Sequence, residues 1–149
     1  MFAPKNILVP TDFSEFSTKA LKKAVDIAQQ YNAKIYLLHV IDEAIHQCAV
    51  DYCLSDAVVK ALEQESLKAS KDKLQKEVDA LAEAGKVNIV FDVKTGVPSE
   101  VILGEEREKG IDLVVIASHG KTGLLKHLIG SVTDKVVRGS SCSVMVVRP

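Results

Sequence analysis

Residues 112–134 read DLVVIASHGKTGLLKHLIGSVTD and carry the clearest structural signal in the chain. The charge-free apolar run Leu113 to Ala117 is typical of a buried parallel strand. Small residues follow it directly, and a second small pair, Gly130 and Ser131, precedes a new helical pattern. Open α/β sheets bind ligands at the carboxyl ends of their strands, and a helix that starts near Ser131 would turn its positive end toward an anion. The stretch therefore predicts an α/β fold with a phosphate site.

Alternating strand and helix patterns extend over the rest of the chain. Further strands are expected at 6–11, 34–41, 87–94 and 143–148, beside the one at 112–117. Helices are expected at 16–31, closed by Asn32, at 56–84, stopped by Gly85, and from Pro98 to near Gly110. In the long helix the inner side is expected to carry Val58, Leu62, Leu67, Leu74, Val78 and Leu81. Right-handed crossovers then predict a single-domain, doubly wound, Rossmann-like sheet of five parallel strands over residues 1–149, with helices on both faces.

Composition limits the classes of partner. The formal charge is -1, from 19 basic and 20 acidic residues, so there is no overall attraction to nucleic acid or to an anionic membrane. No segment reaches the roughly 20 apolar residues of a membrane span, and the first apolar run is too short for a secretory signal. The sequence has an odd number of cysteines, namely Cys48, Cys53 and Cys142, which fits a reducing compartment. We expect a cytoplasmic protein that binds neither nucleic acid nor membrane.

Two common nucleotide motifs are absent from the sequence. Gly120, Lys121 and Thr122 look like the end of a P-loop, but Val115 stands where that pattern needs a glycine. The tripeptide also follows the fourth expected strand instead of the first. No GxGxxG follows the first strand either. These observations argue against a Walker-type ATPase and against a dinucleotide enzyme.

The small residues at 117–120 and 130–131 instead resemble the ATP-binding branch of the universal stress protein family. Its signature is a glycine, two residues, a second glycine, nine residues, and a glycine followed by serine or threonine. Gly120, the spacer 121–129, Gly130 and Ser131 match it, whereas Ala117 stands at the first glycine. The likeness runs along the whole chain, through NILVPTDFSEFSTKAL, LLHVID, TGVPSEVI and SCSVMVVRP.

The resemblance implies a site for ATP or AMP. Asp12 would lie by the adenosine with Pro10 and Thr11, Val40 near the base, and the glycines at the phosphates, where Mg²⁺ or Mn²⁺ would bridge oxygens. In a sheet ordered 3-2-1-4-5, the strands that end near Asp12 and Ala117 are neighbours, which supports the same location independently. The predicted nucleotide-binding set is Pro10, Thr11, Asp12, Val40, Ala117, Ser118, His119, Gly120, Lys121, Gly130, Ser131, Val132 and Thr133.

Structural alternatives exist for several of these residues. Asp12 could cap a helix with Glu15 three residues later, and Ser131 could form a capping box with Asp134. Lys121 is a better phosphate neighbour than Lys135 or Arg138, which are typical of solvated helix surfaces. If position 117 needs a positive φ, alanine there costs about 1 kcal/mol. We expect binding to survive this departure.

Three functions remain open. The favoured one is a stress-response regulator in which nucleotide shifts a conformational equilibrium and orders a flap at Asp42 to Ser55. The second is a slow ATPase or phosphotransferase with His119, His127 or Asp134 as its base; no residue spacing supports nucleophilic catalysis, and no catalytic residue is assigned. The third is a scaffold that lacks nucleotide and senses redox state or metal through His46, Cys48 and Cys53.

The last expected strand bears on assembly. Val144, Met145, Val146 and Val147 form an apolar run that would lie at an edge of the sheet. An exposed edge strand invites pairing with another chain, and members of the resembled family commonly dimerise through it. The sequence therefore predicts a homodimer through this strand.

Overall fold

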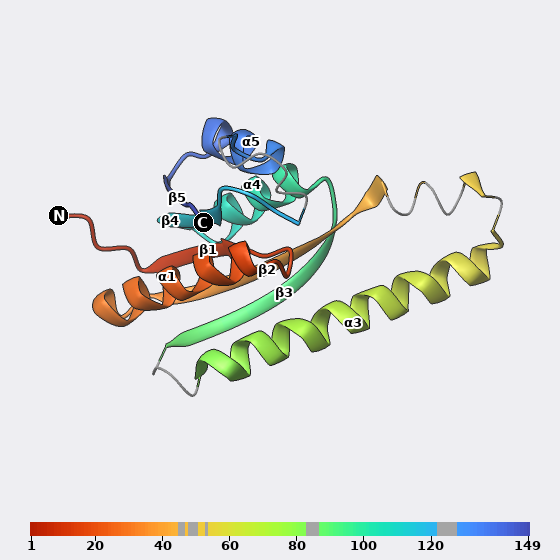
Figure 1. The fold of residues 1–149 in the computed structure, drawn as a ribbon, viewed down its shortest axis with the longest axis horizontal. Helices are drawn as coiled ribbons and strands as arrows, with labels where there is room; N and C mark the ends of the chain where they lie inside the picture. Colours follow the sequence, from red (N-terminus) through yellow and green to blue (C-terminus); the bar gives the residue numbers. More distant parts are fainter. Residues whose placement is uncertain (45–46, 48–50, 53, 83–86, 122–127) are drawn as a thin grey trace.

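The computed structural model describes residues 1–44, 47, 51–52, 54–82, 87–121 and 128–149 (Figure 1). Its strands and helices alternate along the chain. Their bounds are β1 Asn6–Pro10, α1 Glu15–Tyr31, β2 Lys34–Asp42, α3 Asp56–Ala82, β3 Asn88–Gly96, α4 Pro98–Glu108, β4 Leu113–Ala117, α5 Ser131–Gly139 and β5 Ser143–Val147. The five strands pair in parallel in the order β3-β2-β1-β4-β5, which confirms the predicted topology.

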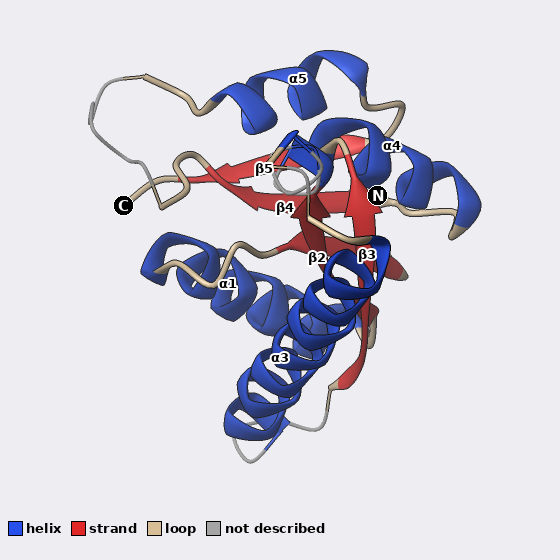
Figure 2. Cartoon of the chain, turned by 90° about the vertical axis from the view of Figure 1, so that its right-hand side faces the viewer, coloured by secondary structure: helices blue, strands red, loops and turns tan. Residues whose placement is uncertain are grey.

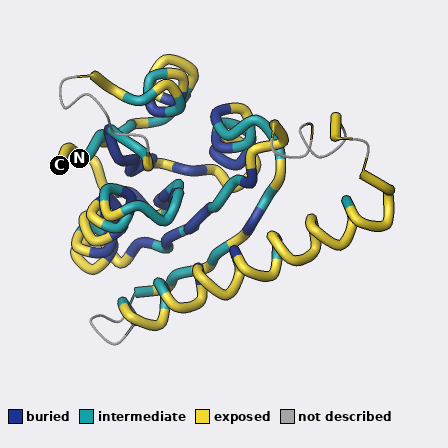
Figure 3. The backbone as a smooth tube through the Cα atoms, turned by 45° about the vertical axis from the view of Figure 1, so that its right-hand side comes forward, coloured by how far each residue is buried: buried dark blue, intermediate teal, exposed yellow. Residues whose placement is uncertain are grey.

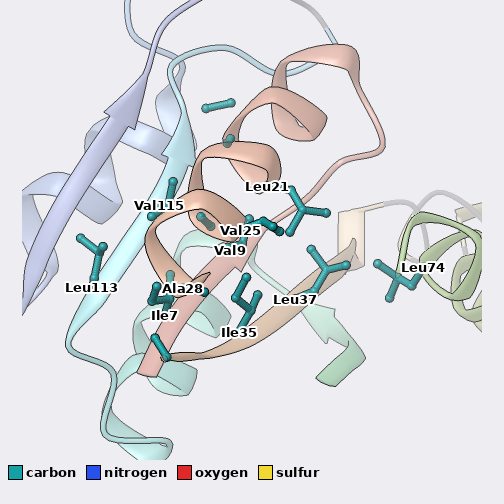
Figure 4. Packing of buried hydrophobic residues seen from close by; sticks show 14 of the residues in the cluster. Ile7, Val9, Leu21, Val25, Ala28, Ile35, Leu37, Leu74, Leu113 and Val115 are labelled. Atoms are coloured by element: carbon teal, nitrogen blue, oxygen red, sulfur yellow. The ribbon is translucent and has the colours of Figure 1, made fainter. Parts of the chain in front are cut away.

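The sheet lies between two helical layers. Helices α1 and α3 cover one face, and α4 and α5 cover the other (Figure 2). All five residues of β4 are buried, as expected for a parallel strand packed on both faces. Figure 4 shows the core beneath α1, where Leu21 and Val25 meet Val9 and Ile35 of the sheet and Leu74 approaches from α3.

Local signals in the sequence set the helix ends. The side chain of Ser14 accepts a hydrogen bond from the N–H of Ser17 and caps α1, and Asn32 ends this helix with a left-handed φ of 52°. Pro98 occupies the first turn of α4, where the missing N–H costs nothing. Predicted and observed strand bounds agree to within two residues, while the expected stop at Gly85 lies outside the described residues.

The predicted inner side of α3 is wrong at its amino-terminal end. Leu74 is fully buried and Leu67, Val78 and Leu81 pack beside it, but Val58 and Leu62 are 44% and 48% exposed. At about 100° per residue, Leu62 lies roughly 120° around the helix from Leu74, and Val58 about 160°. The first turns of α3 also extend beyond the sheet, where Figure 3 shows them exposed. These two side chains therefore face away from the core.

The structure describes only one of the three cysteines, Cys142. His46, Cys48 and Cys53 of the proposed flap lie outside the described residues, so a thiol or metal site there stays a prediction. Cys142 is half-buried beside the core under α4 and α5, and burial raises the pKa of its thiol. Within the described ranges, no helix is long and apolar enough to span a membrane.

Candidate functional site

A cavity of about 330 Å³ opens at the carboxyl ends of β1 and β4. These strands are neighbours in the sheet, and the chain leaves them toward opposite faces, which is the switch point where such folds bind ligands. The volume falls in the range of roughly 300–1,000 Å³ that is usual for small-molecule sites. Of the predicted set, the residues lining it are Pro10, Thr11, Asp12, Val40, Ala117, His119, Gly120, Lys121, Gly130, Ser131, Val132 and Thr133. Ser118 alone among the predicted residues is not in the lining.

Five further residues line the cavity but were not predicted from the sequence, namely Ser17, Leu38, Pro98, Ile102 and Ile116. Two signals could have found some of them. Leu38 lies two residues before Val40, so both side chains point to one face of the sheet. Pro98 and Ile102 are four residues apart and share a face at the start of α4. Together with Val132, these aliphatic side chains form an apolar part of the lining.

Asp12 is held by two backbone groups from separate loops. Its Oδ1 accepts a hydrogen bond from the N–H of Ser14 at 3.0 Å, and its Oδ2 accepts one from the N–H of Lys121 at 2.9 Å. Burial opposes ionisation, but the hydrogen bonds from Ser14 and Lys121 outweigh it and hold the pKa of Asp12 below its ordinary value of 3.8. Because Ser14 caps α1, the interpretation of Asp12 as that helix's N-cap is wrong.

Gly120 lets the loop after β4 approach this carboxylate. A Cβ at position 120 would lie 2.6 Å from Oδ2 of Asp12, closer than real Cβ contacts allow. The backbone of Gly120 does not have a positive φ. The glycine is therefore required by space, not by backbone conformation.

Ser118 fixes the loop from within. It is 1% exposed, its N–H donates to the carbonyl of Val147 at 2.9 Å, and its own carbonyl accepts from the N–H of Gly130 at 2.8 Å. Its Oγ lies 2.6 Å from Nδ1 of His119, whose ring reaches the cavity. Ser118 thus orients neighbours of the site without lining it. Because the N–H of Gly130 already donates to the Ser118 carbonyl, it is not available to bind an anion.

The amino terminus of α5 also borders the cavity, through Gly130, Ser131, Val132 and Thr133. Gly130 is the N-cap and makes no side-chain capping bond, so the proposed capping box of Ser131 with Asp134 is wrong. The carboxylate of Asp134 instead accepts from Nε of Arg138 at 3.0 and 3.1 Å. The first N–H groups of a helix have no acceptor within it, so those of residues 131–133 favour an anion.

Ala117 packs as a core residue at the end of β4. It is 6% exposed, belongs to the apolar cluster under α1 with Val9 and Val115, and does not have a positive φ. Its carbonyl accepts from Oγ1 of Thr133 at 2.7 Å, which ties β4 to α5. The possibility that a methyl at 117 forces a strained backbone is therefore excluded by the structure.

The cations near the cavity differ in position. Lys121 lines it, whereas Lys135 and Arg138 do not, and the Arg138 side chain is 79% exposed. His127, considered above as a base, lies outside the described residues, as does the neighbouring Lys126. Among these three cations, Lys121 is therefore the one placed to contact a phosphate in the cavity.

Comparison with known proteins identifies the family and agrees with the fold. The model of the universal stress protein family matches residues 4–148. Universal stress protein MJ0531 of Methanocaldococcus jannaschii is 33% identical over 144 residues, covering 97% of this chain and 82% of that protein. The solved structure of MJ0577, from the same organism, superposes with a TM-score of 0.85 at 31% identity and covers 99% and 98% of the two chains. Universal stress protein UspA from Lactobacillus plantarum gives a TM-score of 0.82 at 27% identity, with 97% of each chain covered.

Proposed function

The chain belongs to the universal stress protein family, and on that premise we propose that it binds an adenine nucleotide, ATP or AMP, as a regulator in the stress response. The observation that carries the proposal is one cavity whose lining has three chemically different parts. These parts are the Asp12 carboxylate, the amino terminus of α5, and aliphatic side chains of α4 and the sheet.

Charge decides how a nucleotide would lie. The ionised Asp12 repels phosphate but accepts hydrogen bonds from hydroxyl groups, so it suits the ribose. The N–H groups of residues 131–133 and the positive end of α5 suit the phosphates, and Lys121 adds a positive charge to the same lining. The aliphatic side chains of Val40, Ile102 and Val132 suit the flat apolar base. A nucleotide supplies these three groups in one molecule.

A divalent cation fits this site only as a companion of the phosphates. Asp12 is the one carboxylate in the described lining, and the described residues hold no cluster of three metal-ligating side chains. Mg²⁺ commonly keeps several waters and binds phosphate oxygens with few protein ligands. We propose that Mg²⁺ or Mn²⁺ enters with ATP and lowers the repulsion between phosphates and Asp12.

The proposed output is a change of conformation in a cytoplasmic protein. Bound nucleotide would order the segments that border the site and so present a different surface to partners, which requires differential binding and no chemistry. Hydrolysis is a second candidate because His119 lies in the cavity lining. Asp134, the other described residue considered as a base, is paired with Arg138 and lies outside the lining.

A homodimer through β5 is proposed on separate grounds. This strand pairs with β4 alone in the described sheet, so its other edge is open. Met145, in the middle of the strand, is 40% exposed, while Val144 and Val146 pack against the core. An open apolar edge of this kind is suited to pairing with a second copy.

Titration calorimetry with ATP and Mg²⁺ tests the nucleotide proposal. Asp12→Asn keeps the shape of the side chain but removes its charge and one acceptor, and we expect a loss of affinity of about tenfold or more. Asp26→Asn, at an exposed carboxylate of α1, serves as the matched control and should bind like the wild type. Wild-type protein that gives no heat with either ATP or AMP at millimolar concentration would refute the proposal.

A further inference from the structure

The turn after Asp12 stores backbone strain. Phe13 has a φ of 64°, a left-handed conformation that bulky residues rarely adopt unless their surroundings hold them. The N–H of Phe13 donates to Oγ1 of Thr11 at 3.1 Å, and that oxygen lies 3.0 Å from Oγ of Ser17. These bonds close the turn, but they do not by themselves explain why a phenylalanine occupies it.

The ring of Phe13 is held from two sides. Its centroid lies 4.4 Å from that of His39 within β2, and Nζ of Lys73 on α3 lies 5.3 Å from the Phe13 centroid. Nδ1 of His39 is 2.8 Å from the carbonyl of Thr11. A carbonyl can only accept, so Nδ1 carries the proton and the imidazole is fixed against the same turn. The strained residue is thus packed between β2 and α3.

A second contact ties α3 to the start of α1. Glu77 lies one turn after Lys73, and its Oε1 accepts from Oγ1 of Thr18 at 3.3 Å. Asp12 lies near enough to this carboxylate to help raise the pKa of Glu77, after the larger effect of burial. Helix α3 therefore contacts both the strained turn and the helix that follows it.

We propose that Phe13 is a positioning residue through which α3 holds the Asp12 carboxylate in the cavity. Without the ring between His39 and Lys73, the turn relaxes toward a negative φ. That rotation moves the Asp12 carboxylate away from the N–H of Lys121. The consequence for ligand affinity rests on the proposed nucleotide function, whereas the effect on Asp12 does not.

By reciprocity, a ligand that needs Asp12 in place must also strengthen the attachment of α3 to the turn. Ligand binding at the cavity would therefore change how firmly α3 is attached to the turn. The part of this helix that extends beyond the sheet would carry the response to the surface.

The first test uses ligand-free protein and amide hydrogen exchange at Lys121, measured by NMR. Phe13→Ala and Phe13→Gly should each speed exchange by about tenfold, and the conservative Phe13→Tyr should stay within about twofold of the wild type. If Gly behaves like the wild type and Ala does not, backbone conformation alone explains the effect and the role of the ring is refuted. Unchanged exchange in both variants refutes the proposal as well.

The link to α3 is tested with surface variants that do not threaten folding. Lys73→Met should speed exchange at Lys121 by about threefold, and Lys71→Met, at another exposed lysine of α3, should leave it unchanged. Equal effects of the two substitutions would refute coupling through Lys73.

Titration with ATP separates this proposal from the nucleotide proposal. The dissociation constant should rise in the order Phe13→Tyr, Lys73→Met, Phe13→Ala, with at least about fivefold for the last. If wild-type protein binds no ATP, the nucleotide function fails while the exchange results still decide the role of Phe13. If Phe13→Ala speeds exchange but leaves ATP affinity within twofold, positioning of Asp12 does not serve the ligand and that half of the proposal is refuted.

Discussion

The N–H of Lys121 donates to Oδ2 of Asp12 at 2.9 Å, which joins the loop after β4 to the turn after β1. The two residues are 109 positions apart in the sequence. Both residues line the cavity, and the bond helps to keep the pKa of the Asp12 carboxylate below its ordinary value. The predicted properties of the site depend on this bond and on the glycine that permits it.

Gly120→Ala should damage the site through steric overlap. The added Cβ would lie 2.6 Å from Oδ2 of Asp12, so either the loop or the carboxylate must move. We expect ATP affinity to fall by about tenfold or more, measured by calorimetry. Gly104→Ala is the control, because its Cβ meets nothing within 4 Å in the middle of α4. That variant should bind normally and be about 0.5–1 kcal/mol more stable.

Ala117→Gly should not improve binding, although it restores the glycine of the family signature. The methyl of Ala117 packs in the core under α1, and its backbone conformation is accessible to any residue. We expect ATP affinity within about twofold of the wild type and a loss of stability of about 0.5–1 kcal/mol from the more flexible strand end. A clear gain in affinity would show that the methyl obstructs the ligand.

Glu106 predicts a pH-dependent contribution to stability. This carboxylate of α4 is 3% exposed and accepts from Oγ of Ser141 at 2.6 Å and from Oγ of Ser140 at 2.7 Å. It also accepts from the N–H of Ser141 at 2.7 Å and from the N–H of Cys142 at 3.2 Å. Burial opposes ionisation, but these bonds outweigh it and lower the pKa of Glu106 below 4.5. Its stabilisation is therefore complete above the unfolded pKa and is lost as pH falls through the folded pKa.

We accordingly expect Glu106→Gln to lower the free energy of unfolding by about 2–3 kcal/mol at pH 7. The difference from the wild type should shrink once the pH falls below 4.5, the ordinary value for this side chain. Urea unfolding across pH measures it. Glu108→Gln, at the exposed end of the same helix, should change little. A difference between Glu106→Gln and the wild type that is constant with pH would mean that the charge is not responsible.

Met145→Lys should separate the proposed dimer. A lysine on an edge strand hinders pairing with another strand, and Met145 is 40% exposed in the middle of β5. Light scattering should give twice the chain mass of 16.2 kDa for the wild type and the single mass for the variant. Val90→Lys, at the similarly exposed opposite edge of the sheet, should remain dimeric. A wild-type mass of 16.2 kDa at micromolar concentration would refute the proposed dimer.

The fold was predictable because its signals are local and repeat along the chain. Buried strands appear as apolar runs, and the right-handed crossover rule limits how they can be ordered. The position of the cavity was predictable for a similar reason, since Asp12 and Gly120 each follow the carboxyl end of a strand. The order of the strands then brings these segments together.

The errors arose where geometry depends on contacts that a pattern does not contain. Val58 and Leu62 share the apolar character of Leu74 but not its angular position on α3. Residue type alone made Asp12 and Ser131 plausible caps, whereas the backbone begins the helices beside Ser14 and Gly130. The strained φ of Phe13 also left no trace in the sequence.

In the proposed complex, one nucleotide spans the cavity from Asp12 to the amino terminus of α5. A crystal structure of the protein grown with saturating ATP and Mg²⁺ would show whether it does. We expect ribose hydroxyls on the Asp12 carboxylate, phosphates on the N–H groups of Ser131, Val132 and Thr133, and the base against Val40. An empty cavity, or phosphates placed beside Asp12, would contradict it.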